Sequence, residues 1–175
     1  MNGILLHDKA TRHARAMARG RLVWLLAALV VLPCLPLRAQ KSATAQSMEA
    51  QGMVDIATLD STIRVSLMYS RADNFTGQVL YTDLREALLH PRAAKALCEA
   101  QRLLQRRRPD LSLKIYDATR PMSVQAKMWR VVAGTPQQNY VSNPRNGGGL
   151  HNYGMAVDIT LCDALTGDTL DMGTK

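Results

Sequence analysis

The sequence lacks several features that would each define a class of protein. No apolar run reaches the length of a membrane span without meeting a proline. Three cysteines in 175 residues are too few for the disulfide framework of a small secreted scaffold. No internal repeat is visible, and 47% apolar with 21% charged residues is not the composition of a disordered chain. These absences leave one globular domain of ordinary size.

The net charge of +8 is concentrated at the start of the chain. Residues 1–39 hold six basic residues and one acidic residue, whereas residues 40–175 hold 16 and 13, a net charge of +3. The run Arg106–Arg108 fits the C-terminal end of a helix, where the helix dipole favours cations. No aromatic residues interleave with it, so nucleic acid is not an expected partner.

The first 39 residues have the pattern of a secretory signal peptide. A basic front is followed by the apolar run 22–32, then Pro33 and Pro36, then small residues. The prolines make an uncleaved anchor helix a poor alternative, so no stable membrane span is expected after cleavage. Cleavage is expected after Ala39, with Ala45 as the alternative. We therefore expect an exported protein, periplasmic or secreted.

Export changes the interpretation of the cysteines. Cys34 lies in the signal, where Pro33 directly before it is a poor fit to a lipoprotein processing site. The mature chain keeps Cys98 and Cys162. They could form a disulfide in an oxidising compartment or be two small buried side chains, and the sequence leaves both readings open.

The remaining residues predict an α+β fold, in which a small antiparallel sheet is packed by two or more helices. Residues 40–52 are small and polar and read as a flexible tether, so the folded domain is expected over 53–175. Apolar residues that alternate with polar ones predict strands, and apolar residues that recur every three to four positions predict helices. Strands are expected over 54–56, 63–67, 113–118 and 155–161, helices over 91–107 and 123–132, and loops over 68–83 and 135–149.

Few residues of the mature chain can carry metal chemistry. Its two histidines are His90 and His151, and His151 stands seven residues before Asp158. A neutral imidazole and a carboxylate suit zinc, and Gly154 could provide the bend that turns the histidine back over a strand. The spacing alone equally describes a hydrogen-bonded pair with no metal.

Two motifs shift this balance. Gly149-Leu-His-Asn-Tyr-Gly-Met-Ala-Val-Asp158 closely resembles the Ser-x-His-x-x-Gly-x-Ala-x-Asp signature of the zinc D-alanyl-D-alanine dipeptidases of the VanX type. Tyr116-Asp-Ala-Thr-Arg-Pro121 resembles the Tyr-Asp-x-x-Arg-Pro of the same family, in the same order and at similar spacing. Further similar segments are 74–77, 80–81, 140–144 and 170–174, so the resemblance covers about residues 52–175.

The resemblance implies a role for each matching residue. His151 and Asp158 would be two ligands of one Zn²⁺ per chain. Arg120 would stabilise the oxyanion that develops on the scissile carbonyl, because a guanidinium presents rigid donors where charge grows. A structural salt bridge with Asp117 is the alternative for Arg120. Asp117 would support the site from behind the ligands.

Two departures from the family pattern are visible. The serine two places before the histidine is Gly149, so any hydrogen bond from that hydroxyl to substrate would be missing. The family's third zinc ligand and general-base glutamate have no counterpart, because no histidine follows His151 and no glutamate follows Glu99. Cys162 would lie roughly 13 Å along the strand from Asp158, too far to share a metal, and His90 reads as a helix cap.

The sequence therefore predicts a C-terminally truncated zinc metallopeptidase domain that hydrolyses the D-alanyl-D-alanine dipeptide in cell-wall metabolism. A D,D- or L,D-carboxypeptidase or endopeptidase acting on peptidoglycan peptides is the first alternative. A non-catalytic wall-binding relative without the base is the second. The chain itself is expected to be inactive or nearly so, and its expected partner is a small D-amino-acid dipeptide.

Overall fold

The computed structural model describes residues 40–173. The signal peptide expected over residues 1–39, with Cys34, lies outside the described residues. Within residues 40–173, no helix combines the length and apolar character needed to cross a membrane.

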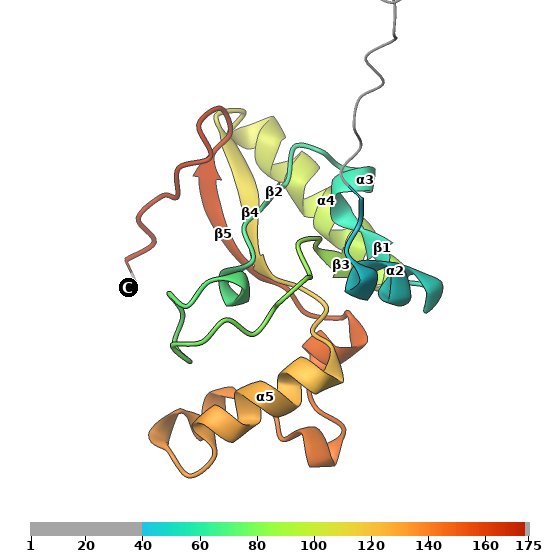
Figure 1. The fold of residues 1–175 in the computed structure, drawn as a ribbon. Coiled ribbons are helices and arrows are strands. Elements are labelled where there is room, and N and C mark those ends of the chain that lie inside the picture. Colours follow the sequence, from blue (N-terminus) through green and yellow to red (C-terminus); the bar gives the residue numbers. More distant parts are fainter. Residues whose placement is uncertain (1–39, 174–175) are drawn as a thin grey trace, which may run out of the picture. The chain divides into compact units, whose positions relative to one another are not determined.

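A three-stranded sheet forms the centre of the fold, in the order β2-β4-β5 (Figure 1). β4 (Leu111–Asp117) pairs antiparallel with β5 (Asp158–Asp163), and β2 (Arg64–Val65) runs parallel to β4. A second, two-stranded sheet pairs β1 (Val54–Asp55) antiparallel with β3 (Leu88–Leu89). The α+β class is confirmed, and the parallel β2–β4 pairing is a detail that the sequence pattern did not reveal.

Two longer helices flank these strands. α4 (Pro91–Arg107) begins as expected, with the His90 ring accepting the Arg92 N–H, and it buries Ala94, Leu97 and Gln101 at three- and four-residue steps. α5 (Met122–Val132) lies near the end of the sheet where β4 stops and β5 begins (Figure 1). The remaining helices are short: α2 (Ala43–Ala50), α3 (Ile56–Leu59), η1 (Met68–Ser70), η2 (Pro136–Tyr140), η3 (Pro144–Asn146) and η4 (Leu150–Tyr153).

The flexible tether expected over 40–52 is wrong, because most of that segment forms α2. The Ser42 hydroxyl caps the helix, and Ala45 and Met48 are buried against the core. Glu86 accepts hydrogen bonds from the Ser42 N–H and hydroxyl, and Asp83 accepts the same pair from Thr44. Two distant carboxylates therefore order a segment that has the composition of a linker.

Several boundaries also differ from the expectation. The strand expected over 155–161 begins only at Asp158, and its first residues are exposed rather than buried on both faces. α5 begins at Met122, one residue before the expected start at Ser123. Cys98 is half-buried and Cys162 is buried, and both are free thiols. The alternative cleavage site after Ala45 would fall within α2.

Candidate functional site

β4 ends at Asp117, and Arg120 follows three residues later, so two of the four residues singled out in the sequence lie at or just after this strand end. The β4–β5 register shifts between Ile115 and Asp117, so that Asp117 stands opposite Asp158. After Asp117 the chain leaves the sheet, and main-chain hydrogen bonds to two different segments hold it in place. The Thr119 N–H donates to the Leu88 carbonyl and the Arg120 N–H to the His151 carbonyl, each at about its usual length.

The short helix η4 places His151 against this strand end. Asn152 ties η4 down, since its side-chain amide donates to the Arg120 carbonyl at 2.8 Å and its side-chain oxygen accepts the Gly149 N–H. Gly154 ends η4 in the left-handed conformation, with φ of 66°, and its carbonyl accepts the His90 N–H. The bend expected at Gly154 is therefore present.

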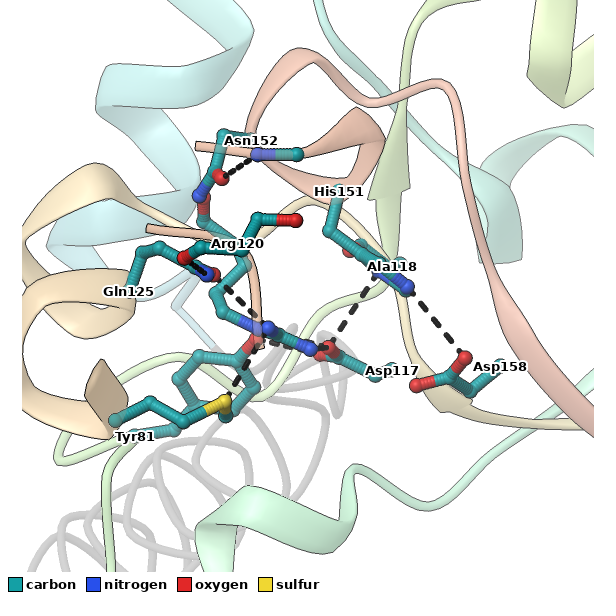
Figure 2. A network of polar contacts seen from close by, with 11 residues as sticks. Tyr81, Asp117, Ala118, Arg120, Gln125, His151, Asn152 and Asp158 are labelled. Atoms are coloured by element: carbon teal, nitrogen blue, oxygen red, sulfur yellow. Dashed lines mark hydrogen bonds and ion pairs between the residues drawn. The ribbon is translucent and has the colours of Figure 1, made fainter. Parts of the chain in front are cut away.

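His151 is held between two acceptors, one at each ring nitrogen. Nδ1 lies 2.9 Å from the Ala118 carbonyl, which can only accept, so Nδ1 carries a proton. Nε2 faces Asp158 Oδ1 at 3.4 Å (Figure 2). Burial by itself would lower the pKa of His151, but the contacts with Asp158 and the Ala118 carbonyl outweigh it and raise this pKa. His151 in turn lowers the pKa of Asp158.

Arg120 lies beside this pair in a buried polar network (Figure 2). Its Nε and Nη2 donate to Asp117 Oδ2, and its Nη1 donates to Gln125 Oε1 at 2.9 Å. The Tyr81 hydroxyl donates to the other oxygen of Asp117. Asp117 is fully buried and the Arg120 side chain is 8% exposed. The alternative of an Asp117–Arg120 salt bridge is thus realised, without removing Arg120 from the site.

Two tyrosines complete the surroundings of the guanidinium. It lies over the Tyr69 ring, with Cζ 5.2 Å from the ring centroid. Burial raises the pKa of Tyr69 to about 12. Burial, together with the Asp117 carboxylate, also raises the pKa of Tyr81, so both hydroxyls stay neutral. Asp117 raises the pKa of Arg120 despite its burial, and the cation is permanent.

Asp117, His151 and Asp158 form the one group of metal-ligating side chains found among residues 40–173. The chemistry of the donors divides the three. His151 Nε2 and Asp158 face each other, as two ligands of one ion would. They are also the two more exposed members of the group. Asp117 approaches the other nitrogen, Nδ1, at 3.5 Å, and its oxygens already accept from Arg120 and Tyr81. The described residues therefore fit a metal with two ligands.

A small polar pocket opens over these groups, with a volume of about 160 Å³. Arg120, Gln125, His151 and Asp158 are among the residues that line it. The lining also includes Tyr69, Phe75, Tyr140, Ser142, Gly149 and Asn152. A volume of this size suits a small polar molecule.

The structure brings together all four residues that the sequence singled out. His90 caps α4, as expected. Cys162 is buried beside the Ser112 carbonyl and is not part of the group. Tyr81, Gln125, Asn152 and Ser142 were missed. Tyr81, Ser142 and Asn152 lie in segments that resemble the family, but each is joined to the site by a hydrogen bond that spans 17 to 36 residues, so the sequence did not indicate its role. Gln125 is only five residues from Arg120 and lies in no such segment.

Gly154 offers a direct test of how η4 is positioned. A Cβ at Gly154 would lie 2.6 Å from the His90 nitrogen and 2.9 Å from Thr119 Oγ1. Gly154→Ala is therefore expected to lower the free energy of unfolding by about 2–3 kcal/mol, from left-handed strain and overpacking together. The control is Gly167→Ala, where φ is also positive but nothing lies within 4 Å. Equal losses in urea unfolding for the two variants would refute the close packing of Gly154.

Comparisons with known proteins identify the family that the chain resembles. A family model described as D-ala-D-ala dipeptidase matches residues 49–175. The D-alanyl-D-alanine dipeptidase of Escherichia coli (strain K12) is 38% identical over 121 residues. That alignment covers 69% of this chain and 58% of the relative, so the chain spans less than two thirds of the relative's length.

Proposed function

The chain belongs to the D-Ala-D-Ala dipeptidase family, and we propose that it serves zinc-dependent hydrolysis of the D-alanyl-D-alanine dipeptide in cell-wall metabolism. The observation that carries the proposal is the His151–Asp158 pair. Nδ1 of His151 is fixed by the Ala118 carbonyl, and this leaves Nε2 directed at Asp158 on the open side of the site. His151 and Asp158 would hold the metal. When bound, zinc polarises a peptide carbonyl and activates a water.

Arg120 would stabilise the negative charge that develops on the carbonyl oxygen. Oxygen acceptors take three of its five N–H donors, two at Asp117 and one at Gln125. The guanidinium is thereby fixed before substrate arrives. Its second Nη1 N–H contacts Met128 Sδ at 3.3 Å, which leaves one Nη2 N–H for the substrate. A preorganised cation costs no reorganisation when charge develops.

Asp117 would act through Arg120 and His151. It holds the guanidinium through two hydrogen bonds and lies 3.5 Å from His151 Nδ1. A buried anion at this place stabilises the cation of Arg120 and the Nδ1-protonated form of His151. Both effects keep the groups in the orientation that the proposed reaction needs.

Two ligands alone hold zinc weakly, because structural and catalytic zinc sites have at least three protein ligands. This chain has no histidine after His151 and no glutamate after Glu99. We therefore propose that the 175 residues by themselves bind zinc weakly and turn over little dipeptide. We also propose that residues 1–39 direct export to the periplasm or medium and are removed after Ala39.

The test compares stereoisomers of the dipeptide. In the presence of zinc, the purified chain is expected to bind D-Ala-D-Ala at least about tenfold more tightly than L-Ala-L-Ala in isothermal titration calorimetry. Hydrolysis, followed by release of free D-alanine, is expected to be slow or absent. Equal affinity for both stereoisomers would contradict the dipeptidase assignment, and rapid turnover would contradict the proposed need for further groups.

A further inference from the structure

The loop between η2 and η3 is tied directly to the arginine network. The Ser142 carbonyl accepts a hydrogen bond from Gln125 Nε2 at 2.6 Å. The oxygen of the same amide accepts from Arg120 Nη1 at 2.9 Å. One side chain, Gln125, thus fixes the main chain of Ser142 relative to the guanidinium. Gln125 is itself buried, with 1% of its surface exposed.

The Ser142 side chain occupies space that a residue with a Cβ at position 149 would need. A Cβ built on Gly149 would lie 2.5 Å from Ser142 Oγ and 3.1 Å from Ser142 Cβ. The backbone of Gly149 is extended, with φ of −133°, so its conformation does not require glycine. The reason for glycine at this position is therefore the room that it leaves for Ser142.

The Ser142 hydroxyl lies beside Gly149 at the candidate pocket. Ser142 and Gly149 both line the pocket over Arg120, His151 and Asp158. Within residues 40–173, the Ser142 carbonyl accepts a hydrogen bond from Gln125, whereas the Ser142 hydroxyl has no hydrogen-bond partner. A hydroxyl can donate and accept, so it can bind either a carbonyl oxygen or an amide N–H of a short peptide.

From these three observations we propose that Ser142 is a substrate-positioning residue. Its hydroxyl binds the polar main chain of the dipeptide and takes the place of the serine that the family pattern has at position 149. This proposal rests on the proposed function, because it needs the dipeptide in this pocket. The hydrogen bond expected to be lost at Gly149 is thus supplied from another segment.

The hydroxyl is tested by Ser142→Ala, which keeps the Cβ and the carbonyl that binds Gln125. Dipeptide affinity in the presence of zinc is expected to fall by about three- to tenfold, the usual effect of one hydrogen bond. Zinc affinity is expected to stay unchanged, since Ser142 is not among the metal-ligating residues. The control is Ser123→Ala, a hydroxyl that is not part of the pocket.

The exchange of positions is tested by moving the hydroxyl. Gly149→Ser alone is expected to displace Ser142, lowering both the melting temperature and dipeptide affinity. Ser142→Gly alone is expected to weaken binding through loss of the hydroxyl. The double variant Ser142→Gly with Gly149→Ser removes the contact and restores a hydroxyl, so its affinity is expected to return to within about twofold of the original chain.

Each outcome of these titrations has a distinct meaning. Dipeptide affinity unchanged in Ser142→Ala would overturn the inference and leave the proposed function standing. Additive losses in the double variant would overturn the exchange between positions 142 and 149. No dipeptide binding by the original chain would overturn the proposed function, and with it the inference.

Discussion

Replacing Asp117 by alanine is expected to lower the free energy of unfolding by about 3–5 kcal/mol, which is the typical effect of breaking a buried ion pair. Asp117 is fully buried, and it accepts two hydrogen bonds from Arg120 and one from Tyr81. Its removal leaves a guanidinium whose side chain is 8% exposed without a counter-charge. The Tyr81 hydroxyl loses its acceptor at the same time. Urea unfolding followed by circular dichroism measures the loss.

A second variant separates charge from packing at position 117, and a variant at position 110 provides an exposed control. Asp117→Asn keeps the size and one acceptor oxygen, so it is expected to lose less stability than Asp117→Ala. Asp110→Ala breaks the Arg108–Asp110 pair, in which both side chains are more than half exposed, and no measurable change is expected there. Losses of similar size at Asp110 and Asp117 would show that burial does not govern the strength of the 117–120 pair.

The sequence was most informative where the signal is local. α4 was predicted with both its ends, because Pro91, the apolar period and the terminal arginines all lie within one segment. Asp117 and Arg120 are three residues apart, and their pairing could be proposed from that spacing. Both signals come from residues close together in the chain, which a sequence pattern can reveal.

The prediction failed where distant residues order a segment. α2 had the composition of a linker, but Asp83 and Glu86, about 40 residues away, hold its first turn. The place of Gln125 between Arg120 and Ser142 could not be foreseen, since it depends on how α5 packs against the loop. The parallel pairing of β2 with β4 is of the same kind. Only tertiary structure determines these contacts.

His151 carries the second large effect, which concerns metal binding. His151→Ala is expected to weaken zinc binding by more than about a hundredfold, because even residues that only support a ligand are worth ten- to a hundredfold. The variant removes the one nitrogen that faces Asp158. Zinc binding stabilises a fold that holds it, so zinc is expected to raise the melting temperature of the original chain but not that of the variant.

The control removes the other histidine of residues 40–173 without removing its structural role. His90 caps α4 by accepting the Arg92 N–H, and serine at this position can accept the same bond. His90→Ser is therefore expected to keep both the fold and the zinc response. Asp158→Asn removes the charge of the second proposed ligand and is expected to fall between the two. A zinc response that survives His151→Ala, or that disappears in His90→Ser, would place the metal elsewhere. If both results are as expected, the His151–Asp158 pair binds the ion.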